Sequence, residues 1–241
     1  MKKPLNRDVI KMLAIIAMTL SHISQIFLPP SVGAQLMLAG GSFTAAAMCW
    51  FVVEGVRKSS NIVDYGKRLA GFALISQVPY CLAFTKDQTI TWQGLNMLYT
   101  LLMIYMMAFF MQTEADKKWR IVLTGAAAAA SLVGDWGGYA TLFGLLFIWA
   151  EEDTHKQVIS FLISFLVHFT AIFTHRMLFG GGIAASSQEA LLQSMGILLA
   201  GLLITYLYNG KRAGHPNFWK WFFYIYYPLH LTVLGIIRIL M

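Results

Sequence analysis

Two histidines, His22 and His230, lie within long apolar runs near opposite ends of the chain. Ionisable side chains inside a membrane span are expensive, so they usually face a cavity or a partner and mark a functional path. Each imidazole could therefore form part of a site inside the bilayer. The alternative for each is a buried ring that only hydrogen-bonds to a neighbouring helix. The sequence favours the functional interpretation for His22 and leaves both open for His230.

The last apolar run surrounds His230 with further polar groups. Tyr226 precedes it by four residues and shares its helical face. Pro228 has no N–H, so the carbonyl of Tyr224 leaves the helical hydrogen-bond ladder and needs another donor. A kinked, polar segment at mid-membrane could be half of a site. An aromatic core with a proline kink explains the same residues.

The first run carries a polar face of its own. Steps of three and four residues along a helix place the following side chains together: Asp8, Lys11, Ile15, Met18, His22 and Gln25. Elsewhere, three polar residues could line the mouth of a cavity on the outer side, namely Gln77, Asn96 and Asp135. Glu54 ends the second run at the inner side, close to a basic strip.

Composition indicates the elements that must position these residues. The 241 residues are 58% hydrophobic and 12% charged. A soluble domain carries about twice that charged fraction, so the excess apolar surface must face lipid. The net charge of +7 lies in short loops between apolar runs, a pattern of membrane topology that does not predict a nucleic-acid partner. We expect the two cysteines, Cys49 and Cys81, to be unbridged thiols in the core.

The predicted fold is a single all-α domain over residues 1–241, a polytopic transmembrane bundle of about nine spans. The apolar runs fall at 9–28, 34–53, 69–85, 96–112, 119–134, 138–150, 157–175, 190–208 and 219–240. With a cytoplasmic N-terminus, fifteen of the eighteen Lys and Arg residues lie inside, which predicts an N-in, C-out orientation.

Depth in the membrane allows the two histidines to meet. Counted from the inner side, His22 is about thirteen residues into its run and His230 about eleven, a difference of about 3 Å in height. Their rings could converge if their helices are neighbours. His168 and His175 share one run but lie roughly 10 Å apart along it. No cluster has the spacing of metal ligands, and we expect no metal site.

Basic residues form a strip at the predicted inner face. Its members are Arg57, Lys58, Lys67, Arg68, Lys211 and Arg212, with Asn209 beside the last two. Inner loops of membrane proteins are generally basic, which explains most of the strip. Part of it could instead bind the phosphates of a nucleotide-like donor from the cytosol. Arg68, at the start of the third run, is the strongest single candidate for that role.

The chain resembles the TraX family of integral membrane acyltransferases almost from end to end. The segments that carry the resemblance are residues 8–18 with His22, 51–55, 65–69, 75–79, 96–101, Asp135 with Tyr139, 208–212 and 222–231. The first run is also similar to that of heparan-glucosaminide-type acetyltransferases. One departure is Ser21, where the family usually has Asp, because a serine cannot raise the basicity of His22 as a carboxylate would. Asp135 could supply that charge, or this member is differently tuned.

The family's namesake is associated with N-terminal acetylation of conjugative pilin, so the resemblance implies an acetyl-CoA or other acyl-CoA donor and a location in the bacterial inner membrane. The phosphates of the donor would meet Arg68, Lys211 and Arg212, with Asn209 beside them. The thioester would lie near His22 and His230. An imidazole could act there as a general base, a role worth roughly 10²–10⁴ in rate, or carry the acyl group covalently.

The resemblance also assigns roles to the remaining polar residues. Tyr226, Gln77 and Asn96 could stabilise the oxyanion or orient the acceptor. The acceptor itself stays open between a peptide amine, a sugar hydroxyl and a lipid headgroup. Two other classes of function are compatible with the sequence: a small-molecule transporter and a non-catalytic membrane assembly factor. A fold alone does not choose between them.

Overall fold

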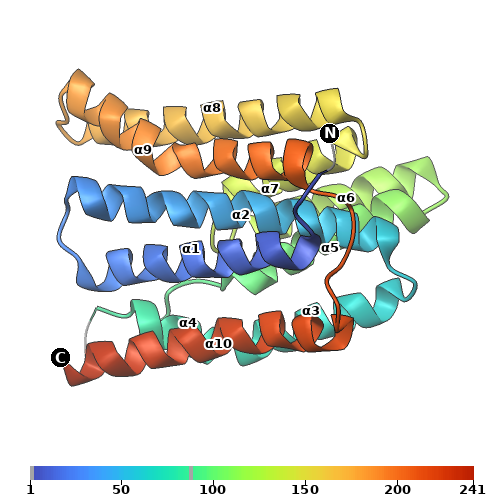
Figure 1. Cartoon of the computed structure of the whole chain (residues 1–241), viewed down its shortest axis with the longest axis horizontal. Helices are drawn as coiled ribbons and strands as arrows, with labels where there is room; N and C mark the ends of the chain where they lie inside the picture. Colours follow the sequence, from blue (N-terminus) through green and yellow to red (C-terminus); the bar gives the residue numbers. More distant parts are fainter. Residues whose placement is uncertain (1–2, 87–88) are drawn as a thin grey trace. The chain divides into compact units, whose positions relative to one another are not determined.

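The computed structural model describes residues 3–86 and 89–241, and the described chain is all-α, as predicted (Figure 1). Its helices are α1 (Arg7–Phe27), α2 (Val32–Lys58), α3 (Ile62–Ile75), α4 (Gln77–Phe84), α5 (Met97–Thr113), α6 (Lys117–Ser131), α7 (Gly137–Ala150), α8 (Thr154–Leu178), α9 (Ile183–Leu202), the π-helical turn η1 (Leu203–Leu207) and α10 (Pro216–Leu240).

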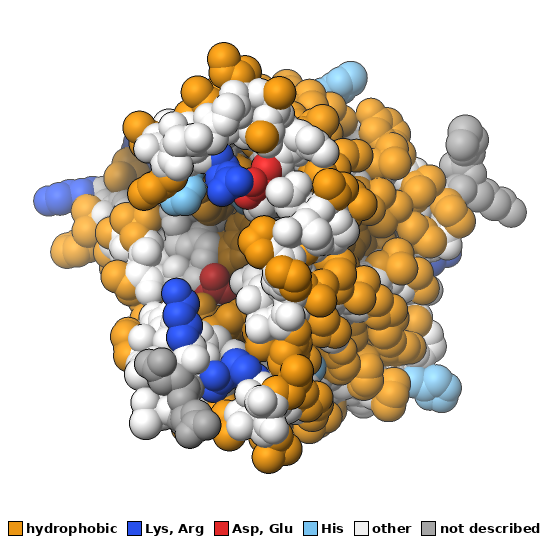
Figure 2. Space-filling model, turned by 90° about the vertical axis from the view of Figure 1, so that its left-hand side faces the viewer, with side chains coloured by type: hydrophobic (Ala, Val, Ile, Leu, Met, Phe, Trp, Pro, Cys, Tyr) orange, Lys and Arg blue, Asp and Glu red, His pale blue; other side chains and the backbone are white. Residues whose placement is uncertain are grey.

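Five helical segments of the described chain are long and apolar enough to cross a membrane. They are α1, α2, α8, α9 continued by η1, and α10, and the shorter helices α5 and α7 are also apolar. Large hydrophobic side chains lie exposed along these helices, among them Leu20, Leu166 and Leu229. In Figure 2, hydrophobic side chains cover most of the right-hand flank, with few charged groups among them. These features are those of a polytopic helical membrane protein.

The third apolar run differs from the single span predicted at 69–85. The chain forms two helices there, because α3 ends at Ile75 and α4 begins at Gln77. Pro79 explains the break, since its ring would clash with the carbonyl of Ile75 in a continuous helix. In the first turn of α4 the missing N–H of Pro79 costs nothing. The helix bonds resume from Tyr80, whose N–H donates to the carbonyl of Ser76 at 2.9 Å.

The chain folds into two compact units. The first unit holds α1, the part of α2 up to Met48, α8, α9 and η1, and the second holds the rest of α2, α3 to α7 and α10. α2 runs without interruption through the boundary at Met48 and Cys49. Both cysteines belong to the second unit, where they are buried and unbridged, as predicted. The prediction of one functional domain over the whole chain stays a prediction.

Small residues bring the helices of the first unit close together. A methyl group added to Gly196 on α9 would collide with backbone atoms of Ala39 and Phe43 on α2. A methyl group at Gly40 on α2 would collide with the backbone of Ala17 on α1. The Thr44 hydroxyl donates to the carbonyl of Ala14 at 2.6 Å across the same helix pair. Backbones that approach this closely in lipid gain packing that larger residues would prevent.

We expect Gly196→Ala to destabilise the protein by about 1–3 kcal/mol, because the added methyl forces α9 away from α2. Gly125→Ala in α6 is the matched control, since no atom lies within 4 Å of the added methyl. That change should be neutral or stabilising by up to about 1 kcal/mol, because alanine is the better helix former. Thermal unfolding in detergent measures both variants. Equal effects of the two substitutions would contradict the close-packing account.

The second unit places α10 alongside α3 and α4 (Figure 1). The ring of Phe72 on α3 stacks on Tyr224 of α10, with centroids 5.0 Å apart. A methyl added to Gly235 of α10 would meet Leu82 on α4. α5 lies against α3, where the Tyr105 hydroxyl donates to the carbonyl of Ile62 at 2.9 Å. These contacts fix α10, and with it His230, relative to the ends of α4 and α5.

Candidate functional site

His230 lies on the buried face of α10 and is 7% exposed. Its Nδ1 is 3.0 Å from the carbonyl oxygen of Tyr226, one turn earlier. A carbonyl only accepts, so Nδ1 carries the proton and Nε2 is the basic nitrogen of the neutral ring. The ring stacks on Tyr226 at 5.2 Å between centroids and meets the edge of Tyr227 at 5.6 Å. Two tyrosines thus fix the orientation of the imidazole.

Tyr227 connects His230 to other polar groups of the second unit. Its hydroxyl accepts a hydrogen bond from the N–H of Met97, the first residue of α5, at 3.3 Å. It also interacts electrostatically with Asp135 and with Tyr80 of α4. Tyr80 and Tyr227 are both buried. We call His230, Tyr227, Tyr80 and Asp135 the His230 cluster, in which α4, α10 and the turn before α7 each supply at least one member.

The backbone of the turn between α6 and α7 holds Asp135 in place. Its N–H donates to the carbonyl of Leu95 at 2.7 Å, and its own carbonyl accepts from the Thr100 hydroxyl at 2.7 Å. The next residue, Trp136, has a φ of 59°, an uncommon conformation for a bulky side chain. Such outliers persist where the surrounding structure determines them and cluster at functional sites. One hydrogen bond therefore fixes the turn to α5, and the other fixes it to Leu95, two residues before that helix begins.

Asp135 lies outside the helices and is half-buried, and the protein atoms packed around its carboxyl group desolvate it. This burial raises the pKa of Asp135 to about 6, against an ordinary value of 3.8. The hydrogen bond from the N–H of Trp136 acts in the opposite direction and is weaker. The carboxyl group therefore changes its charge close to neutral pH.

Gln77 and Asn96 meet beside this cluster. The Asn96 side-chain N–H₂ donates to the side-chain oxygen of Gln77 and to the carbonyl of Ala73, each at 2.8 Å. Its Oδ1 accepts from the N–H groups of Leu98 and Tyr99 and so caps α5. The Gln77 N–H₂ donates to the carbonyl of Gly94 at 2.7 Å. The two amides thus bind each other and the backbone, which fixes the start of α5 against α3 and α4.

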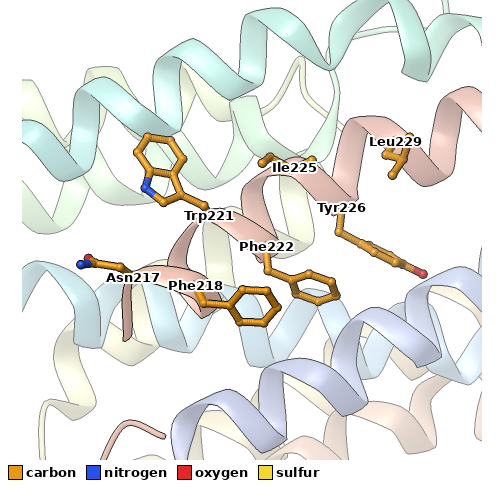
Figure 3. A pocket seen from close by; sticks show the side chains of 7 residues that line it. All are labelled: Asn217, Phe218, Trp221, Phe222, Ile225, Tyr226 and Leu229. Carbon is orange, nitrogen blue, oxygen red and sulfur yellow. The ribbon is translucent and has the colours of Figure 1, made fainter. Parts of the chain in front are cut away.

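Tyr226 lines an apolar groove along α10 (Figure 3). The groove has a volume of about 420 Å³, and its lining residues are Asn217, Phe218, Trp221, Phe222, Ile225, Tyr226 and Leu229. It begins in the first turn of α10 and extends to the turn that carries His230. Figure 3 shows the rings of Phe218, Phe222 and Tyr226 in one row along the helix.

Charged groups gather where α2 ends and α3 begins. Glu54 is 1% exposed and accepts from the Lys58 ammonium at 2.9 Å. The Nε and Nη1 atoms of Arg57 and the Nε atom of Arg68 are buried without a hydrogen-bond partner among the described residues. The sequence singles out Arg68 but gives no reason to choose Arg57, because the burial of single nitrogen atoms depends on tertiary packing.

The remaining candidates belong to the first unit. On α1, His22 is half-buried, whereas Ser21 and Ser24 are 1% and 4% exposed. The predicted polar face of α1 is half-buried at His22 and becomes exposed at its last member, Gln25. The buried face of α1 passes instead through Ser24, whose hydroxyl donates to the carbonyl of Ala34 at the start of α2 at 3.0 Å.

Asn209, Lys211 and Arg212 lie in the segment that follows η1, and both basic side chains are exposed. Asn209 Oδ1 accepts from the N–H of Lys211 at 2.9 Å, and the carbonyl of Lys211 accepts from the N–H of Arg7 at 2.9 Å. Asp8 Oδ2 accepts from the N–H of Ala213 at 2.7 Å. These bonds place the segment beside the start of α1. The predicted meeting of His22 with His230 involves both units and stays a prediction.

Two members of the His230 cluster, Tyr80 and Tyr227, are absent from the sequence prediction. Tyr227 directly precedes Pro228 in the segment that carries His230, and that position was its only signal. Its importance follows from contacts with α4, α5 and the turn at Asp135, which no helical periodicity predicts. Within the described ranges, no group of three or more His, Cys, Asp or Glu residues could hold a metal ion.

Comparisons with known proteins agree with the resemblance of the sequence. The family model for TraX protein matches residues 6–238. A probable fimbrial assembly protein, FimC of serogroup H1 from Dichelobacter nodosus, is 28% identical over 232 residues, covering 93% of this chain and 92% of that protein. Protein TraX from Escherichia coli is 28% identical over 253 residues, covering 98% and 88%. No solved structure matches the chain significantly.

Proposed function

Because the chain belongs to the TraX family, we propose that it is a membrane acetyltransferase that uses cytosolic acetyl-CoA. The observation that carries this proposal is the family match over residues 6–238, which contains every candidate site residue named above. The family is associated with acetylation of pilin, and one relative is named as a probable fimbrial assembly protein. A pilin-like peptide amine is therefore the favoured acceptor, ahead of a hydroxyl on a sugar or lipid.

The geometry around His230 supports a role as general base. Its Nδ1–H is held by the carbonyl of Tyr226, so Nε2 can take a proton from the acceptor. Acetyl-CoA would supply an activated thioester. As the acceptor nitrogen or oxygen bonds to the acetyl carbon, the bond from that carbon to sulfur breaks. The carboxylate of Asp135 interacts electrostatically with Tyr227, which contacts the His230 ring, so it would place a negative charge in the cluster where His230 takes the proton.

Other predicted residues take supporting roles in the proposal. Gln77 and Asn96 position α5 through their mutual hydrogen bonds. The groove beside Tyr226 offers a path along α10 toward His230. Lys211, Arg212 and Asn209 would contact the donor at the cytoplasmic face, with the N-terminus inside and the C-terminus outside a bacterial inner membrane. Positive residues concentrated in the predicted inner loops support this orientation.

Transfer of a labelled acetyl group tests the proposal directly. The purified protein in lipid nanodiscs should move label from acetyl-CoA to a peptide with a free, pilin-like N-terminus. The same peptide with a blocked N-terminus is the control and should stay unlabelled if the acceptor is the terminal amine. Labelling of neither peptide, together with acyl-CoA-independent binding of a small solute, would favour a transporter.

The name of the Dichelobacter nodosus relative also permits a non-catalytic role in fimbrial assembly. A factor of that kind would tolerate the loss of both His22 and His230. A double variant that still supports assembly of fimbriae in cells, without any acetyl transfer in vitro, would point to this second function.

A further inference from the structure

At the corner between α2 and α3, two arginine side chains have buried nitrogen atoms that form no hydrogen bond with any described residue. Arg57 lies one residue before the end of α2, and Arg68 lies in the second turn of α3. Both side chains are half-buried, yet Nε and Nη1 of Arg57 and Nε of Arg68 are inaccessible to water and unbonded within the described chain. A guanidinium group does not lose its proton in proteins. Burying its donors without a partner costs free energy that a bound anion would recover.

The carboxylates nearest in sequence do not fill this role. Glu54 is bonded to Lys58 at 2.9 Å. Asp64 is exposed and accepts from the side chain of Asn61 at 2.6 Å. Among the described residues, Nε and Nη1 of Arg57 and Nε of Arg68 therefore have no carboxylate or other group as a hydrogen-bond partner. The partner for this corner is therefore expected from outside the chain.

The local packing keeps both arginines at one end of the second unit. Only three residues, 59–61, connect α2 with α3. The Tyr65 ring lies so close to Gly55 that a methyl added to Gly55 would come within 2.9 Å of it. Tyr65 is one turn before Arg68, and Gly55 is two residues before Arg57. The contact of the Tyr65 ring with Gly55 holds the two helix ends close together.

We propose that Arg57 and Arg68 form a phosphate-binding site at the α2–α3 corner. The planar fork of a guanidinium group matches the oxygens of a phosphate better than a lysine does. The phosphate can come from the donor, acyl-CoA, or from an anionic lipid headgroup. Only the assignment of the phosphate to acyl-CoA rests on the proposed function. The phosphate site itself is inferred from the buried arginine nitrogen atoms that have no partner among the described residues.

Binding of coenzyme A and of its fragments tests the site. The full chain in phosphatidylcholine nanodiscs is titrated with coenzyme A, and with pantetheine, which has no phosphate. Arg57→Gln and Arg68→Gln should each weaken the binding of coenzyme A by about ten- to a hundredfold, the effect of a lost hydrogen bond to a charged group. Pantetheine should bind equally to all variants. Lys67→Gln, an exposed position beside Arg68, is the matched control and should leave both affinities unchanged.

Arg57→Lys and Arg68→Lys keep the positive charge but lose the planar guanidinium group. They keep the test usable if the Gln variants fail to fold. Gel filtration verifies the fold of each. If coenzyme A binding is unaltered but phosphatidylglycerol raises the melting temperature of the wild type more than that of the Arg variants, the site holds lipid phosphate. If neither coenzyme A nor phosphatidylglycerol distinguishes the Arg variants from the wild type, the proposal is overturned.

The same variants separate this proposal from the proposed function. If the Arg57 and Arg68 variants transfer acetyl groups normally, with an unchanged KM for acetyl-CoA and no lipid effect, the phosphate site is contradicted while the proposed acetyltransferase function stands. If coenzyme A binding depends on Arg57 and Arg68 but the protein transfers no acetyl group, the phosphate site is supported and the proposed acetyltransferase function is not.

Discussion

Replacing His230 by Gln is expected to lower the rate of acetyl transfer by about 10²–10⁴-fold and to leave the protein folded. Glutamine has a similar length and can still donate to the carbonyl of Tyr226, so the packing on Tyr226 and Tyr227 is largely kept. It cannot take a proton at the position of Nε2. The rate with saturating acetyl-CoA and acceptor is the measurement, and the melting temperature verifies the fold.

Other histidines of the chain supply the controls. His175→Gln changes an exposed ring and should leave the rate unchanged. His168→Gln changes a buried ring whose Nδ1 is 2.8 Å from the Ser194 hydroxyl, so it should affect stability more than rate. His22→Ala should abolish transfer if both imidazoles act together, and the double variant with His230→Gln should then be no slower than either alone. Near wild-type turnover of His230→Gln would exclude it as the base.

Asp135→Asn is expected to reduce kcat/KM above pH 7 by about a hundredfold, because the amide removes the negative charge from the cluster in which His230 takes the proton. The pKa of Asp135 is raised to about 6 by burial, so its carboxylate is present only above that pH. In the wild type, kcat/KM should rise as the pH passes through about 6. The variant should lose this inflection. Asp64→Asn, an exposed position, is the control and should keep it.

The pH dependence of protein stability measures the titration of Asp135 independently of activity. The pKa of Asp135 is higher in the folded protein than its ordinary value of 3.8, so the folded state binds this proton more tightly. The stability that results is present below the ordinary pKa and is lost as the pH rises through about 6. Asp135→Asn should therefore match the wild type in melting temperature near pH 4 and exceed it at pH 7. A constant difference between the two proteins across this range would contradict the raised pKa.

Much of the helical architecture was predictable because its signals are local. Long apolar runs gave α1, α2, α8, α9 and α10, and the four-residue spacing placed Tyr226 beside His230. Pro79 indicates the break between α3 and α4, but hydropathy alone predicts a single apolar span there. Helical periodicity groups His22 and Gln25 on one face of α1, but the neighbouring helices decide which part of that face is buried, and Gln25 is exposed.

The His230 cluster could be predicted only in part. Asp135 and His230 stood out as polar residues near apolar runs, and the structure links them through Tyr227. Tyr80 and Tyr227 looked like ordinary aromatic residues of a membrane helix. Their role depends on the turn at Asp135, which is distant in sequence from both α4 and α10, and such a pairing follows from tertiary contacts alone. The sequence also could not predict that Nε and Nη1 of Arg57 are buried without a hydrogen-bond partner among the described residues, because that too depends on tertiary contacts.

The hydrogen bond between the N–H of Met97 and the Tyr227 hydroxyl has an electrostatic consequence. Met97 opens α5, so the positive end of the α5 macrodipole points into the His230 cluster. That end is equivalent to roughly half an elementary charge. A peptide backbone can thereby favour negative charge on Asp135, or on an oxyanion formed beside it, in surroundings where a lysine would be costly to desolvate. The end of α5 would thus offset part of the free energy that burial of the Asp135 carboxylate costs.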